Sequence, residues 1–293
     1  MSSDLPTFDL YTYFRSSCSA RLRIALNLWG IPYNPIFVHL LKNEQFSEHH
    51  KALNPSLSVP VLVAHRASED DIVIPQSIAA LEYLEETIRS TNPQNRTLLP
   101  NDPRLRSITR SLVSIIASDV QPLTNLRSQR WIKELEADPI PYCRKATEAG
   151  FAAYEALASK VAGTFSVGDE VTLADVCLVP ATWSAARFGV DIQNYPTIAR
   201  VVARMEEEDA VKKAHWRNQP DTPEEFSRSE LLIALDRESP YICTKSRTEL
   251  YRCRNLLKIR CWEWRLGHWN VGFPGSDRNM PLCHGWNSSV PVR

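Results

Sequence analysis

The chain has 293 residues, 43% of them hydrophobic and 23% charged, so it is long enough to fold as one large or two ordinary globular domains. Its 34 basic and 34 acidic side chains balance, which argues against nucleic acid or an anionic membrane as a partner. No segment approaches the roughly 18–20 apolar residues that span a bilayer, and residues 1–9 lack the pattern of a signal peptide. With seven scattered cysteines, we expect a cytoplasmic protein with free thiols.

The first 90 residues alternate between strand-like and helical patterns. Strand patterns of alternating or β-branched residues cover 7–13, 34–40, 59–64 and 71–74. Helical patterns cover 17–29, 43–53 and 76–88, and the first of these is followed by Gly30, a common residue at a helix C-terminus. The last two strand patterns are separated by a short polar turn and predict a hairpin. This order predicts a mixed four-stranded sheet covered by helices.

A proline-rich stretch at 90–102 predicts a linker between two domains. Beyond it the patterns are helical, at 103–130, 141–161, 173–188 and 196–214. Thr172 and Asp175 have the spacing of a helix N-capping signal. The fold class is therefore α/β followed by all-α, with the second domain over 103–226.

Residues 227–293 differ from the rest of the chain. From residue 228 onwards there are 11 basic and 6 acidic side chains, four of the eight tryptophans and four of the seven cysteines. We interpret this segment as an atypical extension: a small appended element, a disordered segment or translated non-coding sequence. Its cysteines and histidines lack the spacing of a zinc site, so we expect no metal.

The most informative segment is the turn that opens the first predicted helix. Ser16 and Ser17 place two hydroxyls at a helix N-terminus, where free N–H groups and the helix dipole favour an anion. Cys18 follows, and a cysteine at a helix N-terminus is expected to be reactive. The alternative is that one serine is only a helix cap and that Cys18 is a small buried side chain.

Two further segments could also contact a ligand. Val59 precedes Pro60, and a cis peptide there would expose the backbone of Val59 to an extended ligand. Gln76 and Ser77 open the third predicted helix, where they could hold an ammonium group and a carboxylate. Either segment could instead be an ordinary strand start or a capping serine.

Together and in this order, these segments resemble the glutathione transferase family. The run S-S-C-x-x-R-x-R-I-A-L that begins at Ser16 is similar to a signature of its zeta class. The resemblance continues through 121–126, 167–175, 187–191 and 219–223, and it covers about residues 5–226. It implies a thioredoxin-like glutathione-binding domain at 5–89, a helical substrate-binding domain at 103–226, and a homodimer.

The resemblance also implies glutathione as the cofactor and a cis peptide before Pro60. The γ-glutamyl carboxylate would lie on Gln76 and Ser77, and the cysteinyl backbone on Val59. The thiol would lie beside the catalytic residues Ser16, Ser17 and Cys18. Further glutathione contacts are implied at Gln45, Gln121 and Asn125.

The activity implied is cis–trans isomerisation of maleylacetoacetate to fumarylacetoacetate, in tyrosine and phenylalanine breakdown. Arg15 and Arg187 resemble the family's carboxylate-binding arginines, although Arg187 alone would also fit a solvated helix end. Arg21 and Arg23, inside the first helix, are interpreted as residues of structural or surface ion pairs. Two other functions stay open: a transferase acting on α-halo acids or other electrophiles, and a non-catalytic binding module with the same fold.

Overall fold

The first part of the chain folds around a four-stranded mixed sheet. The computed structural model describes residues 5–66, 69–91 and 96–227. The strands are β1 (Thr7–Thr12), β2 (Asn34–Phe37), β3 (Val61–His65) and β4 (Ile72–Pro75), in the spatial order β2-β1-β3-β4. β1 is parallel to β2 and antiparallel to β3, and β3 and β4 form the predicted hairpin. The sequence-based prediction of a mixed four-stranded sheet is confirmed.

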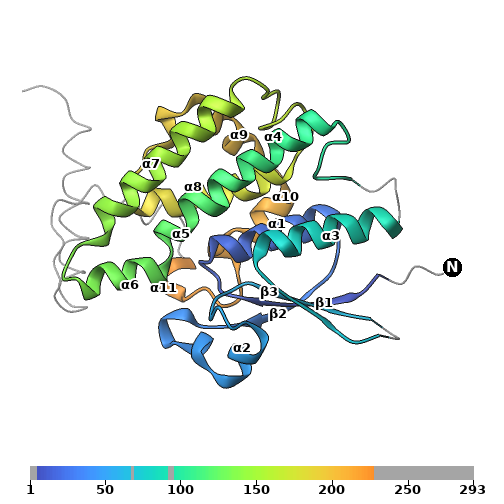
Figure 1. Ribbon diagram of the computed structural model, residues 1–293, viewed down its shortest axis with the longest axis vertical. Helices are drawn as coiled ribbons and strands as arrows, with labels where there is room; N and C mark the ends of the chain where they lie inside the picture. Colours follow the sequence, from blue (N-terminus) through green and yellow to red (C-terminus); the bar gives the residue numbers. More distant parts are fainter. Residues whose placement is uncertain (1–4, 67–68, 92–95, 228–293) are drawn as a thin grey trace, which may run out of the picture. The chain divides into compact units, whose positions relative to one another are not determined.

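Helices cover both faces of this sheet. α1 (Ser17–Trp29) and α3 (Ser77–Thr91) lie on one face, and α2 (Glu48–Leu53) lies on the other (Figure 1). Between β2 and α2 the chain forms two short 3₁₀ helices, η1 (Leu40–Lys42) and η2 (Glu44–Phe46). η1 begins at Leu40, so β2 is shorter than the predicted strand 34–40. α1 begins after its cap, Ser16, and ends at Gly30, whose φ of 66° suits glycine, so the prediction of this helix is confirmed.

The second part of the chain is helical in the residues that the structure describes. Its elements are the α-helices α4 to α11, the π-helix η3 and the 3₁₀ helices η4 and η5. Their bounds are α4 (Pro103–Ser114), η3 (Ile115–Val120), α5 (Gln121–Thr124), α6 (Leu126–Glu134), α7 (Pro139–Ala158), α8 (Leu173–Arg187), η4 (Ile192–Asn194), α9 (Pro196–Glu206), α10 (Asp209–Ala214), η5 (Trp216–Asn218) and α11 (Glu224–Ser227).

The prediction of one helix over 103–130 is wrong, because this segment divides into α4, η3, α5 and α6. Pro122 has no N–H to continue the helical hydrogen bonds, and the preceding turn widens into the π-helix. Asn125 then starts α6 as its N-cap, with its Oδ1 accepting from the Ser128 N–H at 2.9 Å. The predicted helix 196–214 likewise divides into α9 and α10.

The start of α8 matches its prediction. The Asp175 carboxylate accepts from the Thr172 N–H at 2.7 Å and from the Thr172 hydroxyl at 2.9 Å. It also accepts from the backbone N–H of Ser166 at 2.8 Å, which ties the preceding loop to the helix. Burial raises the pKa of Asp175, while these hydrogen bonds act in the opposite direction. The side chain is fully buried, so it fixes the helix start inside the core.

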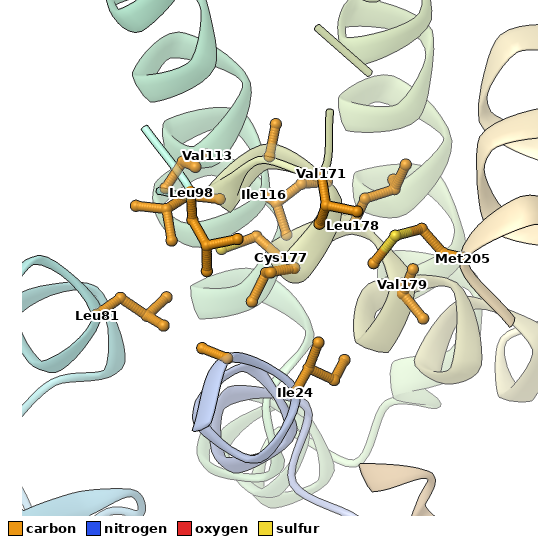
Figure 2. Packing of buried hydrophobic residues seen from close by; sticks show 14 of the residues in the cluster. Ile24, Leu81, Leu98, Val113, Ile116, Val171, Cys177, Leu178, Val179 and Met205 are labelled. Atoms are coloured by element: carbon orange, nitrogen blue, oxygen red, sulfur yellow. The ribbon is translucent and has the colours of Figure 1, made fainter. Parts of the chain in front are cut away.

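One apolar core joins the two parts. Ile24 of α1 and Leu81 of α3 belong to the same buried cluster as Cys177 of α8 and Met205 of α9 (Figure 2). α1 packs against both α8 and α10. All described residues belong to a single compact unit, so the boundary between the predicted domains 5–89 and 103–226 stays a prediction.

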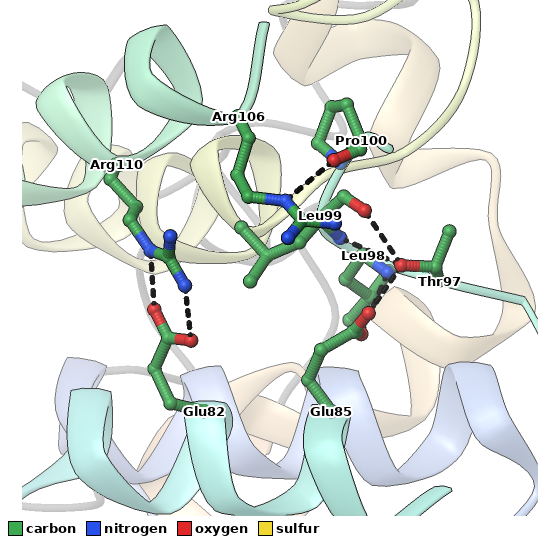
Figure 3. A network of polar contacts seen from close by, with 8 residues as sticks. All are labelled: Glu82, Glu85, Thr97, Leu98, Leu99, Pro100, Arg106 and Arg110. Atoms are coloured by element: carbon green, nitrogen blue, oxygen red, sulfur yellow. Dashed lines mark hydrogen bonds and ion pairs between the residues drawn. The ribbon is translucent and has the colours of Figure 1, made fainter. Parts of the chain in front are cut away.

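The predicted linker is packed in the part that the structure describes. Leu98 and Leu99 are buried, and the Glu85 carboxylate of α3 accepts from the Thr97 hydroxyl and, at 2.9 Å, from the Leu98 N–H (Figure 3). Beside them, Arg110 of α4 forms a bidentate pair with Glu82 of α3, at 2.9 Å for each bond. The connection therefore bonds α3 to the start of α4.

The interpretation of Arg23 as an ion-pair residue is wrong. Its side chain is buried and bonds the carbonyl oxygens of Phe14 (3.0 Å) and Ala214 (3.2 Å) and the Thr12 hydroxyl (2.9 Å). No carboxylate of the described residues pairs with it. Burial lowers the pKa of Arg23 to about 10. The guanidinium therefore links the end of β1, α1 and α10 through neutral acceptors.

The predicted extension, 227–293, lies outside the described residues except for Ser227. Its cysteines and histidines, for which we expect no metal site, lie outside them as well. In the part of the chain that is described, no helix has both the length and the apolar character that crossing a bilayer requires.

At Gly150, α7 packs closely against the π-helix η3. A Cβ built at Gly150 would lie 2.0 Å from Cγ2 of Val120, the last residue of η3. We expect Gly150→Ala to lower the free energy of unfolding by about 1–3 kcal/mol, despite alanine's higher helix propensity. Urea unfolding would measure this. Adding Val120→Ala should restore most of the loss, and a single variant as stable as the wild type would contradict this packing.

Candidate active site

A cleft of about 860 Å³ lies where the sheet domain meets α5, α6 and α8. Its walls come from the N-termini of α1 and α3, the loop before β3, η1 and η2, and the helices of the second part. All twelve residues that the sequence predicts for the site line this cleft: Arg15, Ser16, Ser17, Cys18, Gln45, Val59, Pro60, Gln76, Ser77, Gln121, Asn125 and Arg187. A second hollow, about 660 Å³, runs along α4 and η3 and contains none of them.

The N-terminus of α1 forms the floor of the cleft. Ser16 is the helix cap, and its Oγ accepts from the Ser19 N–H at 3.1 Å. This bond uses only acceptor capacity of the hydroxyl, so the Ser16 O–H can still donate to a ligand. Ser17 and Cys18 follow in the first turn, where backbone N–H groups have no partner within the helix. Capping and anion binding are therefore compatible here.

The loop before β3 presents free backbone to the cleft. The Val59–Pro60 peptide is cis, as predicted. The Ser58 carbonyl oxygen accepts from Asn54 Nδ2 at 2.7 Å and lies 3.0 Å from His50 Nε2. These contacts hold the loop, and among the described residues the Val59 N–H makes no backbone hydrogen bond. Val59 can therefore pair with an extended, peptide-like ligand.

The turn from β4 into α3 supplies the next two residues. Gln76 has φ = 93°, a conformation that is unfavourable for a residue other than glycine and is often found at binding sites. Ser77 opens α3, and its Oγ accepts from Arg21 Nη1 at 3.0 Å. The hydroxyl and backbone N–H of Ser77 thus stand at a helix N-terminus, beside a buried cation.

Gln45, in η2, lines the cleft with an incompletely bonded amide. The residue is 4% exposed, and its Oε1 has no hydrogen-bond partner among the described residues. A buried acceptor without a donor is costly, and an N–H group of a ligand would remove this cost. The amide therefore fits a ligand with peptide groups, such as glutathione.

Two of the arginines that line the cleft, Arg15 and Arg187, are neighbours. Burial lowers the pKa of Arg187, and the neighbouring Arg15 cation lowers it further. The Arg15 guanidinium lies 5.7 Å from the ring centre of Phe14 and 5.5 Å from that of Phe226. Neither arginine forms an ion pair with a described carboxylate. An anion bound here would relieve the repulsion between the two cations.

The sequence did not predict the contribution of α6 to the cleft. Arg130 Nη2 donates to the Leu40 carbonyl oxygen and to Asn43 Oδ1, at 3.0 Å each. Arg127 donates to the carbonyl oxygen of Ser56. The spacing of these two arginines, three residues apart on a helix with one polar face, is the only sequence signal for this role. Through them α6 closes one side of the cleft against η1 and the loop before β3.

We expect Arg130→Met to loosen this side of the cleft, because it removes the hydrogen bonds from α6 to Leu40 and to Asn43. Amide hydrogen exchange should become faster in α6 and in residues 40–43. Lys133→Met is the matched control, since Lys133 lies on the same helix, is exposed, and makes no side-chain hydrogen bond or ion pair among the described residues. Equal exchange in both variants would show that Arg130 does not hold α6.

Comparisons with known proteins place the chain among glutathione transferases. Residues 15–87 match the family model for the glutathione S-transferase N-terminal domain, and residues 127–209 match that for the C-terminal domain. A maleylacetoacetate isomerase of Aspergillus fumigatus is 56% identical over 226 residues, which cover 76% of this chain and 96% of that protein. The maleylacetoacetate isomerase of Rattus norvegicus is 45% identical, over 74% of this chain and 96% of that protein.

Two solved structures have the same fold. A bacterial maleylpyruvate isomerase, described as a zeta-class glutathione S-transferase, is 41% identical with a TM-score of 0.67, over 73% of this chain and all of that one. A glutathione-bound maleylacetoacetate isomerase of Anaeromyxobacter dehalogenans is 38% identical with a TM-score of 0.67, over 74% of this chain and 98% of that one. The chain belongs to the zeta class of the glutathione S-transferase family.

Proposed function

We propose that the protein is a glutathione-dependent cis–trans isomerase that converts maleylacetoacetate to fumarylacetoacetate. The observation that supports this most is the pair Arg15 and Arg187, which lines the same cleft as the cap hydroxyl of Ser16. The substrate has acidic groups, and two guanidinium groups without carboxylate partners suit such a molecule. The relatives named above as maleylacetoacetate isomerases support the same substrate.

Glutathione fits the residues of the sheet domain, 5–89. Within the described part of the chain, Gln45 has a buried acceptor without a donor, and the Val59 N–H makes no backbone hydrogen bond and can pair with a peptide group. Ser77 and Gln76, at the start of α3, suit the charged γ-glutamyl end. Gln121 and Asn125 would contact glutathione from the opposite wall, although Asn125 Oδ1 also caps α6.

Bound glutathione supplies a thiolate, which adds reversibly to the conjugated double bond and so permits rotation before the alkene reforms. Ser16 donates its hydroxyl hydrogen to the sulfur and thereby favours the deprotonated form. The helix dipole of α1 and the N–H groups of Ser17 and Cys18 add to this stabilisation. Arg15 and Arg187 hold the substrate carboxylates, so that the double bond faces the sulfur.

The same donors at the N-terminus of α1 also stabilise negative charge that develops on the substrate. Arg187, from the helical domain 103–226, orients the substrate together with the neighbouring Arg15. The proposal includes a homodimer, a cytoplasmic location and a role in tyrosine and phenylalanine breakdown.

The proposal is tested with maleylacetone, a stable substrate mimic, and glutathione. We expect Ser16→Ala to lower kcat by about 100-fold or more, because it removes the donor to the thiolate.

Arg187→Met should mainly raise KM, by about 10- to 100-fold, because it removes a charged hydrogen bond to the substrate. Arg104→Met, an exposed arginine of α4 away from the cleft, serves as the control and should behave as the wild type.

Other outcomes would redirect the proposal. Full activity of the Ser16 variant would refute the role of the cap hydroxyl. Wild-type protein that displaces halide from an α-halo acid but does not isomerise maleylacetone would be a transferase for other electrophiles. Protein that binds glutathione and turns over neither compound would be a binding module.

A further inference from the structure

Arg21 is a buried cation next to the cleft that none of the steps above uses. It lies in α1 one turn after Cys18 and is 2% exposed. Its Nη1 donates to Ser77 Oγ at 3.0 Å, whereas its Nε and Nη2 have no partner among the described residues. Its interpretation as an ion-pair residue is therefore wrong. A charge that is buried without a carboxylate and with free donors is costly, so its presence calls for an explanation.

The buried carboxylates of the described residues do not compensate this charge. There are two of them, Asp175 and Glu85, and both accept hydrogen bonds from hydroxyl and backbone N–H groups elsewhere. Arg23, the other buried arginine of α1, differs in that its guanidinium bonds several oxygens. Arg21 thus has one acceptor in the part of the chain that the structure describes, and that acceptor, Ser77 Oγ, is a side chain of the cleft.

The direction of this hydrogen bond decides what Ser77 can do. A guanidinium has donors only, so Ser77 Oγ must be the acceptor. The Ser77 hydroxyl hydrogen then has to point away from Arg21, and no described residue accepts it. With its backbone N–H at the start of α3, Ser77 is left with two donors for one ligand. Two donors at one residue suit a carboxylate.

We propose that Arg21 is a positioning residue that fixes the Ser77 hydroxyl as a donor to the γ-glutamyl α-carboxylate of glutathione. This inference rests on the proposed function, since it concerns how the same cleft recognises its cofactor. Without Arg21, the Ser77 hydroxyl rotates freely. Binding of the carboxylate must then fix the hydroxyl in one orientation, and this loss of entropy weakens the affinity for glutathione. Arg21 thus acts on affinity for glutathione and not on the isomerisation step.

The test compares Arg21→Met with Ser77→Ala and with the double variant by calorimetric titration of glutathione. We expect Arg21→Met to weaken glutathione binding about 10- to 100-fold, and the double variant to bind no more weakly than Ser77→Ala alone. Binding of γ-aminobutyryl-cysteinylglycine, which lacks only the α-carboxylate, should be unchanged by Arg21→Met. At saturating glutathione, kcat should equal that of the wild type.

The Tm of the ligand-free protein distinguishes a positioning role of Arg21 from a role in packing. Arg21→Met should leave the Tm of the ligand-free protein unchanged or higher, because it removes a buried charge with unpartnered donors. Arg23→Met is the matched control and should lower Tm, because it leaves several oxygens without a donor. The inference is overturned if Arg21→Met lowers Tm as much as Arg23→Met does and weakens the binding of glutathione and of γ-aminobutyryl-cysteinylglycine equally. It is also overturned if the losses of glutathione affinity caused by Arg21→Met and Ser77→Ala add up in the double variant. In either case Arg21 has a structural role only. If the wild type binds no glutathione, the proposed function itself fails.

Discussion

The cleft depends on the burial of α1. Its residues 19–26 are all buried, between the sheet on one side and α8 and α10 on the other. A helix that is enclosed in this way cannot shift without opening the core, because protein interiors are close-packed. Arg23 adds a polar constraint, since its guanidinium bonds Thr12 at the end of β1 and Ala214 at the end of α10. The first turn of α1 is therefore held in one position, and that turn is the floor of the cleft.

Positive charge outweighs negative charge in the cleft, where Glu134 is the one carboxylate among the described residues that line it. The N-termini of α1 and α3 contribute the positive ends of helix dipoles, and Arg15 and Arg187 contribute full charges. In most of a protein such an arrangement would be destabilising, because buried charges need partners. A ligand with several carboxylates supplies those partners. The same field favours the anionic form of a bound thiol, so recognition and activation share one origin.

The sequence predicts the ends of α1 because both carry local signals, a capping serine and a glycine with positive φ. It does not predict the division of 103–130, because the π-helix changes the hydrogen bonding without changing the apolar pattern, and only Pro122 signals the break. Arg130 and Arg23 were not predictable, since both bond carbonyl oxygens far away in the sequence. A capping serine such as Ser16 is common to many helices, so no single residue of the cleft identifies the site. The cleft residues were predicted as a set because their segments together resemble those of a known family.

The segment just before residue 228 contacts the residues that precede α1. Asp221 accepts from the Phe14 N–H at 2.8 Å, and the ring of Phe226 stacks on that of Phe14, with centres 6.1 Å apart. The Arg15 guanidinium lies over the Phe226 ring as well. The orientation of a cation that is encoded near the start of the chain thus depends on an aromatic ring more than 200 residues later. A truncation from the C-terminal side that removes Phe226 therefore also removes a ring that packs against Arg15 and Phe14.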